Sequence, residues 1–482
     1  MKRWLSLLPA LLLAFPALFS CGETQIPDEI PTTGPESGAE TEEPAVSERY
    51  DIPEPDLPAL DCGGETFWIA GGQNDVFLFA ETLIGEVVND AVFRRNLLVE
   101  EQYNLKLKRL AASQEITNLI AAGETMDLIY RDAPGFAATV FSGGYQNLTN
   151  IPYLSLEAEY WSPNAFRGLN VDSQVFFLPN EISMDPLSMT SFLYFNKRIL
   201  NEYDLENPYD LVYGNEWTID KYLELIRKVP RDLNGDGKMD DQDLFGDIHR
   251  YEYRTAAFLQ LYFGCGQTYT RPDPDSGRVL AMDGEFTQAL IDKLYVVLND
   301  PSICVDHFNN YTDEDYQEYL RLFMEGHGLF LQSEIRAMNV LREMEDDFGI
   351  IPNPKFNSDQ ENYYNRVHPY AGMFAVSVTA PDTERTGIVT EYMAWLSHCT
   401  VLPAYYEITI KQKRTRDTDA EEMLDIIRRS MVYEFADVFE VSIANYMWDA
   451  YCDRSYARKV LSSEKIIKKR LEKFVKRLRA LD

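Results

Sequence analysis

The chain has 482 residues, of which 45% are hydrophobic, and this length predicts more than one packed core because single cores stop growing at roughly 250–300 residues. The formal net charge is −33, which argues against nucleic-acid binding and against adsorption to anionic lipid, since both need clustered Lys and Arg. The cysteines after Cys21 are far apart in the sequence, and no CxxC metal or redox motif occurs.

The N-terminus has the pattern of a secretory signal. Lys2 and Arg3 precede an apolar run over 4–19, which is shorter than the roughly 20 residues of a membrane-spanning helix. The run ends in Leu-Phe-Ser-Cys21, which resembles a bacterial lipobox, whose cysteine is lipid-modified and becomes the mature N-terminus. The resemblance implies a signal peptide over 1–20 and a lipoprotein on the outer face of the bacterial cytoplasmic membrane. The alternative is a plain secreted protein that carries Cys21.

An acidic, Pro-rich segment follows Cys21. Residues 22–61 are rich in Pro, Glu, Asp, Ser and Thr and hold few large apolar residues. Such a composition cannot bury enough surface to offset the entropy of ordering, and its like charges repel one another. We therefore expect a disordered tether over 21–62 that keeps the body of the protein near the membrane.

Strand and helix patterns alternate at the start of the body. Apolar or alternating runs predict strands at 66–70, 104–110 and 126–130, and helical spacing predicts helices at 86–103 and 116–122. This order is typical of an α/β fold with a parallel sheet covered by helices on both faces. Ligands of such sheets bind off the carboxyl ends of the strands. That rule places four polar residues at a ligand-binding rim: Asn74, Asp75, Arg131 and Asp132.

Several longer segments resemble the extracellular solute-binding proteins of family 1, the maltose-binding type of ABC importers. They begin with VFFLPNEISMDPLSMTSFLYFNKRIL at 175–200 and continue with NEWTIDKYLELIRKV, YLRLFMEGHGLFLQSE, DFGIIPNPKF and YAGMFAVSVTA in the family's order. The resemblance implies a two-lobed, periplasmic-binding-protein-like α/β fold in which each lobe is a mostly parallel sheet flanked by helices. It assigns lobe 1 to 63–178 and 351–402, lobe 2 to 179–350 and 403–482, and hinge strands to 176–181, 349–354 and 401–404.

The same resemblance implies a function, namely capture of a carbohydrate between the lobes by hinge closure and its delivery to an ABC permease. It implies a monomer that is not an enzyme and needs no organic cofactor. Sugars stack on aromatic rings and bond to polar side chains. Besides the four rim residues, the matching segments offer as polar contacts Glu181, Ser333 and Glu334, and as stacking rings Tyr145, Trp161, Tyr251, Tyr370 and Trp448. For each ring, packing in the core is the alternative.

Residues 232–243 have the spacing of an EF-hand-type calcium loop, D-x-N-x-D-G-x-x-D-x-x-D. The expected ligands are Asp232, Asn234, Asp236, the backbone carbonyl of Lys238, Asp240 through water, and Asp243. Asp stands at the last position, where EF-hands prefer a bidentate Glu, so we expect a structural Ca²⁺ that binds weakly, with a Kd on the order of 10⁻⁴ to 10⁻³ M. The alternative is an acidic turn without an ion.

An enzyme is a rival interpretation. The five histidines stand in no HExxH or HxH motif, and GxSxG does not occur. The paired carboxylates of a glycosidase are not excluded by counting acids. A cell-surface glycan-active enzyme, a non-transport sensor or adhesion lipoprotein, and the same fold with a peptide or anion ligand therefore stay open.

The C-terminal stretch 455–479 is basic, in contrast to the rest of the chain. Its apolar residues recur at helical spacing, among them Ile467, Leu471, Val475 and Leu478. We expect an amphipathic helix that docks on the body with its basic face toward acidic residues. Binding of nucleic acid or of a membrane surface is the alternative.

Overall fold

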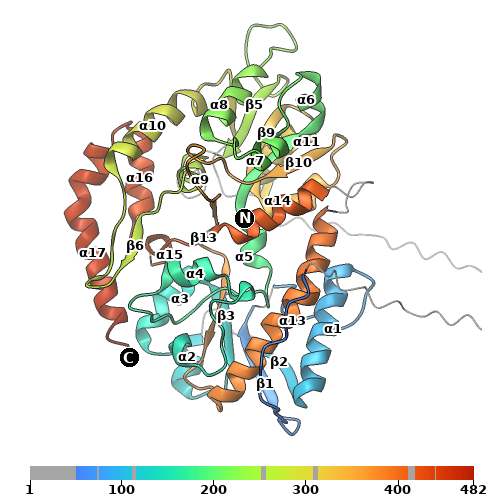
Figure 1. Cartoon of the computed structure of the whole chain (residues 1–482), viewed down its shortest axis with the longest axis vertical. Coiled ribbons are helices and arrows are strands. Elements are labelled where there is room, and N and C mark those ends of the chain that lie inside the picture. The colour runs from blue at the N-terminus through green and yellow to red at the C-terminus, as the bar shows by residue number, and fades with distance from the viewer. Residues whose placement is uncertain are drawn as a thin grey trace, which may run out of the picture. The chain divides into compact units, whose positions relative to one another are not determined.

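The computed structural model describes residues 50–72, 75–110, 116–250, 257–307, 313–410, 418–439 and 441–481. The chain divides into two units, 1–45 and 46–482, and all helices and strands named below belong to the second unit. Two sheets with their own helices define two lobes within this unit (Figure 1). The α/β, two-lobed fold class predicted from the sequence is confirmed.

The first lobe is built on a four-stranded sheet with the order β12-β3-β1-β2. β1 is parallel to β2 and to β3, whereas β12 runs antiparallel to β3. The elements of this lobe are β1 (Thr66–Gly71), α1 (Val87–Tyr103), β2 (Lys106–Leu110), α2 (Ile116–Ala122), β3 (Leu128–Asp132), α3 (Ala133–Thr139), α4 (Pro163–Leu169), β12 (Gly372–Val376) and α13 (Thr383–Ile410). The predicted strands and helices of the first 70 residues of the body are therefore present.

The second lobe is built on a five-stranded sheet with the order β10-β4-β9-β5-β8. β4 is antiparallel to both of its neighbours, and β5 is parallel to β8 and β9, so this sheet is mixed rather than mostly parallel. Its strands are β4 (Ser191–Asn196), β5 (Phe245–Arg250), β8 (Cys304–His307), β9 (Gly328–Glu334) and β10 (Phe348–Ile351), with α6 (Lys197–Glu202), α7 (Pro208–Tyr213), α8 (Ile219–Lys228), α9 (Ala257–Gly264), α10 (Gly284–Leu298), α11 (Asp313–Met324) and α12 (Met338–Leu341) between them.

Short elements complete the chain around these two sheets. They are α5 (Asp185–Ser188), the hairpin of β6 (Thr270–Asp273) and β7 (Gly277–Leu280), the parallel pair of β11 (Asn365–Arg366) and β13 (Met431–Val432), and the C-terminal helices α14 (Thr418–Arg429), α15 (Phe435–Val438), α16 (Ile443–Cys452) and α17 (Ser462–Leu478).

One predicted hinge strand is wrong. Residues 401–404 lie inside α13, a helix of 28 residues that runs beside α1 (Figure 1). Pro403 is within this helix, although proline removes a backbone donor and normally ends a helix. Val401 and Leu402 are completely buried, so packing of the helix against the lobe outweighs the local preference of the proline.

The tether predicted over 21–62 is wrong for its last part, because residues 50–62 lie on the body. Tyr50 is buried in edge-on contact with Tyr406, and its hydroxyl donates to Glu421. The carbonyl of Ile52 accepts a hydrogen bond from Trp395 Nε1 at 3.1 Å. Tyr50 and the backbone of Ile52 thus contact α13 and α14, which composition does not reveal. The rest of the tether and the signal peptide lie outside the described residues.

The basic C-terminal helix docks through its apolar face. Ile467, Leu471, Val475 and Leu478 of α17 are buried, as the helical spacing predicts. Arg479 forms an ion pair with Asp172 of the first lobe. Most other basic side chains of α17 are exposed to solvent, so the expectation that they turn toward acidic residues of the body holds only locally.

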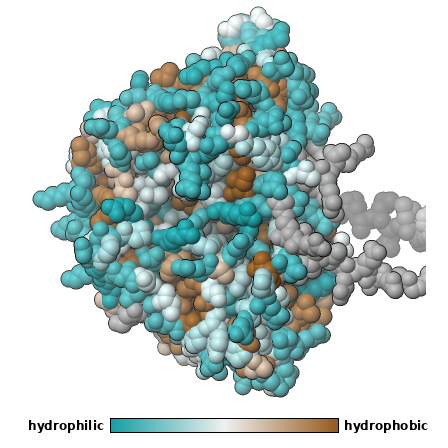
Figure 2. All heavy atoms as spheres, in the orientation of Figure 1, coloured by the Kyte–Doolittle hydropathy of each residue, from teal (hydrophilic) through white to brown (hydrophobic). Residues whose placement is uncertain are grey.

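The visible surface is mainly hydrophilic, with hydrophobic residues scattered between polar ones (Figure 2). Over the residues that the structure describes, we find no helix with the length and apolar character needed to cross a bilayer.

A buried ion pair stabilises the first lobe. Asp127 accepts hydrogen bonds from Trp68 N and from Thr386 Oγ1, and it pairs with Arg385 at 2.6 Å. Arg385 also pairs with Glu65, whose side chain is 70% exposed.

We predict that Asp127→Ala lowers the free energy of unfolding by about 3 kcal/mol, because it leaves the buried Arg385 and the Trp68 N–H without their main partner. Glu65→Ala is the matched control, since it removes an exposed partner of the same arginine and should cost less than about 1 kcal/mol. Urea unfolding followed by circular dichroism measures both. Equal losses for the two variants would contradict this assignment.

Candidate functional site

The segment 175–190 connects the two sheets and carries the centre of the candidate site. Leu178 bridges to Phe374 of the first sheet, and Thr190 bridges to Val367 just before β4 begins. Between them lies α5, which starts with Asp185 and Pro186, and proline at this position favours the first turn of a helix. Figure 1 shows α5 between the two lobes. Side chains of this short helix can therefore reach both lobes.

Asp185 links α5 to the end of the first sheet. Its Oδ2 accepts a hydrogen bond of 2.8 Å from the backbone N–H of Gly372, the first residue of β12. A Cβ at position 372 would lie 1.9 Å from the hydroxyl of Tyr130. Only glycine fits there, so the close approach of the chain to Tyr130 is part of the design of this site.

Asp75 and Tyr130 meet the same crossing segment. Asp75 follows β1, and its Oδ2 accepts a hydrogen bond of 2.6 Å from Ser183 Oγ. Tyr130 lies on β3, with its hydroxyl 3.1 Å from Ser183 Oγ. Burial, together with Asp75 and Asp185, raises the pKa of Tyr130, so its hydroxyl keeps its proton. The carboxyl ends of β1 and β3 thus converge on one serine.

The second lobe contributes Glu334 and Arg336, which follow directly at the end of β9. Their side chains form an ion pair of 2.5 Å in which Glu334 is nearly buried and Arg336 is 44% exposed. We call Asp75, Tyr130, Ser183, Asp185, Glu334 and Arg336 the inter-lobe cluster. Burial raises the pKa of Asp185 to about 6; the Gly372 N–H opposes this rise, and the charge of Asp75 adds to it. Three carboxylates share this space, and the guanidinium of Arg336 pairs with one of them, Glu334.

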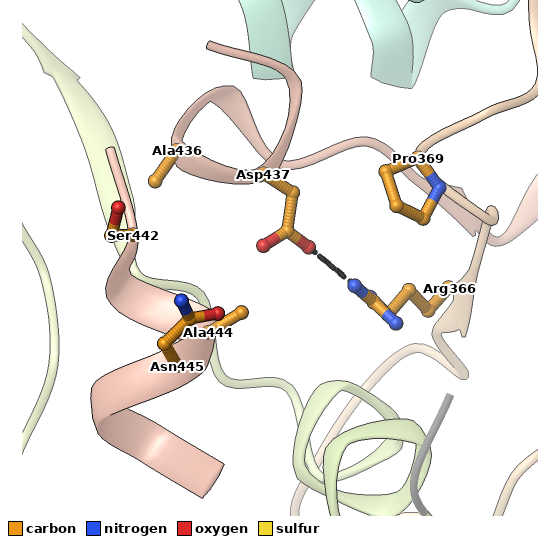
Figure 3. Close-up of a pocket in the computed structure, with 7 residues that line it drawn as sticks. All are labelled: Arg366, Pro369, Ala436, Asp437, Ser442, Ala444 and Asn445. Atoms are coloured by element: carbon orange, nitrogen blue, oxygen red, sulfur yellow. Dashed lines mark hydrogen bonds and ion pairs between the residues drawn. The ribbon is translucent and has the colours of Figure 1, made fainter. Parts of the chain in front are cut away.

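A polar cavity of about 150 Å³ lies beside the chain that leads to Gly372. Figure 3 shows Arg366 and Asp437 pointing toward each other in its wall, where they form an ion pair of 2.6 Å. Asn445 and Ser442 lie on the opposite side of the cavity. Pro369 forms a further part of the wall. Ligand sites commonly measure about 300 Å³ or more, so this cavity alone is smaller than a sugar site requires.

Tyr370 follows Pro369 and is the exposed aromatic ring nearest in sequence to β12. It is 41% exposed, and its ring lies 5.6 Å from that of His368. Its backbone N–H donates to His368 Nδ1 at 3.2 Å, which fixes the turn that carries the ring. The chain therefore presents an exposed aromatic ring one residue after Pro369, which lines the cavity of Figure 3, and two residues before Gly372.

The structure brings several predicted site residues together. Asp75 and Glu334 belong to the inter-lobe cluster, and Tyr370 lies two residues before Gly372. Arg131 and Asp132 lie opposite Met373 and Gly372 in the pairing of β3 with β12. One side-chain oxygen of Asp132 caps α3 by accepting a hydrogen bond from Gly135 N. Ser333 precedes Glu334 on β9 and is buried against β4, where it pairs with Phe192.

Three predicted stacking rings lie elsewhere. Trp161 is 1% exposed and donates from Nε1 to Glu391, and Tyr145 is buried with its hydroxyl 2.5 Å from Thr139 Oγ1. Trp448 is half-buried on α16, with its ring 5.7 Å from that of Tyr451. Core packing, the alternative stated for each ring, describes Trp161 and Tyr145. A Trp or Tyr ring with a polar atom can pack in the core as well as it can stack on a ligand. The sequence alone does not distinguish core packing from ligand stacking.

Glu181 serves as a structural ion-pair partner. It accepts from His398 Nδ1 at 2.6 Å and from Arg428 at 2.8 Å, and both partners are buried. Burial opposes ionisation of Glu181, but Arg428 and His398 outweigh it and hold the pKa of this carboxyl below its usual value. A second cavity of about 150 Å³ opens beside Glu181 and Arg428. Asn74 and Tyr251, like Cys21, lie outside the described residues.

Sequence reasoning missed Tyr130, Ser183, Asp185 and Arg336. A signal existed for Asp185, because an Asp-Pro pair after an apolar crossing strand starts a new turn between two lobes. Tyr130 looked like an ordinary strand residue, since its neighbours Leu128 and Ile129 are apolar. Its role depends on the contact with Gly372 and Ser183, which are distant in sequence.

In the loop 232–243, side-chain oxygens accept hydrogen bonds from backbone N–H groups of the loop itself. Asp232 accepts from the N–H groups of Gly235 and Gly237, Asn234 from Asp236, and Asp236 from Lys238. Each of these oxygens keeps a further lone pair. Asp243 instead accepts from Leu233 N and Asp240 N with its two oxygens, at 2.9 and 2.8 Å. Both oxygens of Asp243 therefore close the loop, and calcium binding here stays a prediction.

Neither a scan against protein-family models nor a search of curated proteins gives a match to this chain. Solved structures do match. The apo form of RafE from Streptococcus pneumoniae aligns with a TM-score of 0.53 and 12% identity over 86% of this chain and 98% of that one. A cyclo/maltodextrin-binding protein in complex with maltotetraose aligns with a TM-score of 0.54 and 12% identity over 86% and 96% of the two chains.

The ABC substrate-binding protein Lmo0181 from Listeria monocytogenes, in complex with cycloalternan, aligns with a TM-score of 0.50 and 12% identity over 85% of this chain and 99% of that one. These alignments span nearly the whole length of the solved proteins. The chain therefore has the two-lobed fold of ABC solute-binding proteins.

The raised pKa of Asp185 predicts a pH dependence. In an unfolded chain an Asp has a pKa of about 3.9. The folded protein therefore holds this proton more tightly, so the stability that protonated Asp185 contributes falls as the pH rises above about 4 and is lost once the pH passes about 6. Compared with Asp185→Asn, the natural protein should lose roughly 2 kcal/mol of unfolding free energy between pH 4.5 and 7.5.

Urea unfolding of both proteins at the two pH values measures this difference. Asp61→Asn is the control, because a hydrogen bond from Gly63 N–H lowers the pKa of the exposed Asp61 and moves its titration below this range. An Asp185→Asn difference that stays the same at pH 4.5 and 7.5 would contradict the placement of Asp185 in the inter-lobe cluster.

Proposed function

We propose that this protein is an extracytoplasmic solute-binding protein of an ABC importer that holds a carbohydrate between its lobes. The observation that carries the proposal is the inter-lobe cluster, a set of carboxylates and a tyrosine gathered from both lobes of a solute-binding fold. The solved proteins in complex with maltotetraose and cycloalternan have this fold, which supports a saccharide as the ligand class.

The chemistry of the cluster suits a neutral, hydroxyl-rich ligand. The side-chain oxygens of Asp75 and Glu334 accept hydrogen bonds, while Arg336 donates them, and sugar hydroxyls do both. The exposed ring of Tyr370 offers a face for the C–H groups of a pyranose ring. An anionic ligand would meet three carboxylates here, which disfavours it. The cavity of Figure 3 would take one end of the saccharide, and the ring of Tyr370 would cover a further part of the saccharide.

Hinge closure gives the binding step its mechanism. A ligand that contacts both lobes stabilises the conformation in which they are close, by as much as its affinities for the two conformations differ. Asp185 lies on the crossing segment and already bonds to Gly372 of the first lobe. Its neighbours Asp75 and Glu334 come from opposite lobes. A saccharide that bonds to both would therefore stabilise the closed conformation.

Anchoring and delivery complete the proposal. Lipidation of Cys21 would hold the body near the membrane, and the residues before Tyr50 would act as the tether. The partner would be the transmembrane subunits of an ABC permease, to which a monomer hands its sugar without catalysing a reaction. A structural Ca²⁺ in the loop 232–243 would stiffen the connection between α8 and β5.

Substitution of Tyr370 tests the ligand site. We predict that a saccharide from a glycan panel raises the Tm of the natural protein. At 100 times its Kd, the saccharide should add about 2.7 kcal/mol to the free energy of unfolding. Tyr370→Ala should weaken its binding by roughly 10- to 100-fold, because the stacking surface is lost. Isothermal titration calorimetry measures both affinities.

Tyr213→Ala is the control, since Tyr213 is also an exposed ring, at 53% against 41% for Tyr370, and lies on α7, which contributes no residue to the inter-lobe cluster. It should leave saccharide affinity unchanged. A panel in which peptides or anions shift the Tm and saccharides do not would contradict the carbohydrate assignment.

The calcium loop is tested separately. We predict that Ca²⁺ titrated into the protein gives binding heat with a Kd on the order of 10⁻⁴ to 10⁻³ M, and that Asp232→Ala abolishes it by removing the first ligand. Asp241→Ala, within the loop but outside the ligand positions, is the control. If Ca²⁺ gives no heat and Asp232→Ala leaves the Tm unchanged, the loop is an acidic turn.

A further inference from the structure

A buried cluster of metal-ligating side chains lies in the second lobe, away from the inter-lobe cluster. Asp247 and His249 are two residues apart on β5, and Cys304 begins the neighbouring strand β8, where it pairs with Asp247 in the parallel register. The three residues are 0%, 2% and 4% exposed. One ligand atom from each lies within 4.8 Å of the ligand atoms of the other two.

The hydrogen bonds of this cluster leave two buried acceptor atoms unpaired among the described residues. Asp247 Oδ2 lies 2.7 Å from His249 Nδ1 and accepts from Gln332 Nε2 at 3.0 Å. Asp247 Oδ1 is buried and has no hydrogen-bond partner among the described residues, and the same holds for Gln332 Oε1. Leaving a buried acceptor unpaired costs about 1–3 kcal/mol, more when it is charged, and such atoms are rare in native proteins.

A divalent cation would satisfy these atoms. A thiolate, an imidazole nitrogen and a carboxylate oxygen are the ligands that Zn²⁺ takes in proteins. With Zn–S of about 2.3 Å and Zn–N of about 2.0 Å in tetrahedral geometry, sulfur and nitrogen stand about 3.6 Å apart. The ligand atoms of the three side chains lie within 4.8 Å of one another, so side-chain rotation on adjacent strands can bring them to this separation.

We propose that Asp247, His249 and Cys304 form a structural site for a thiophilic divalent cation of the Zn²⁺ class. The ion binds Asp247 Oδ1, a ring nitrogen of His249 and Cys304 Sγ, and the thiol proton passes to solvent as the thiolate forms. Asp247 Oδ2 keeps its bond to Gln332. The ion ties β8, the edge strand of the sheet, to β5, and its charge balances the buried carboxylate.

This site differs from the calcium loop in its chemistry and from the carbohydrate site in its place. The loop 232–243 offers only oxygen ligands, which hard cations prefer, whereas Cys304 selects a softer ion. The proposal of Zn²⁺ at Cys304 does not depend on the proposed transport function, so an experiment can disprove one proposal and leave the other standing.

The test uses the purified protein, folded in the presence of Zn²⁺ and then freed of excess metal. We expect one tightly held zinc per chain by elemental analysis. Co²⁺ exchanged into the same protein should give a thiolate-to-cobalt absorption band and the visible bands of a tetrahedral ion. Cys304→Ser should weaken Zn²⁺ binding by at least about tenfold and remove the thiolate band. Cys399→Ser, which alters another buried cysteine on α13, is the matched control and should change neither.

Failure of Cys304→Ser to fold leaves the test intact, because the Co²⁺ spectrum of the natural protein alone decides whether a thiolate binds the ion. A natural protein that retains no zinc overturns the proposal. So does zinc retained equally by Cys304→Ser, which would place the ion elsewhere, and so does a cobalt complex without a thiolate band.

Discussion

The hydrogen bond between Asp185 and the N–H of Gly372 ties the segment that crosses between the lobes to the first lobe. It is made by a carboxylate on a four-residue helix and by the first residue of a strand in the first sheet. Because Gly372 has no side chain, Tyr130 can approach it, and Ser183 then connects Tyr130 to Asp75. The polar residues of both lobes are arranged around this contact.

Burial of Asp185 explains why this arrangement suits binding rather than stability. A carboxylate with a pKa of about 6 next to Asp75 and Glu334 is a costly way to hold two lobes together. A ligand that donates hydrogen bonds to these acids relieves part of that cost, so ligand binding and lobe closure favour each other. Buried ion pairs lie elsewhere, Asp127 with Arg385 in the first lobe, and Glu181 of the crossing segment with His398 of α13 and Arg428 of α14.

The sequence predicted the fold better than the site. Local patterns sufficed for β1, α1, β2, α2 and β3, because each strand and helix carries its own periodicity. The prediction of the site residues failed where contacts between residues distant in sequence determine the role of a side chain. Trp161 looks like a stacking ring until Glu391, 230 residues later, is seen to bind its Nε1. Asp185 gains its role from Gly372, and 401–404 becomes helical because α13 packs on α1, none of which a local pattern encodes.

The most direct measurement is a crystal structure of the protein grown with the saccharide that raises its Tm most. The account predicts that the sugar lies between the carboxyl ends of β1 and β3 and the end of β9, with its hydroxyls bonded to Asp75, Asp185 or Glu334 and a ring face on Tyr370. A sugar bound to one lobe only, away from Asp185 and Tyr370, would contradict it.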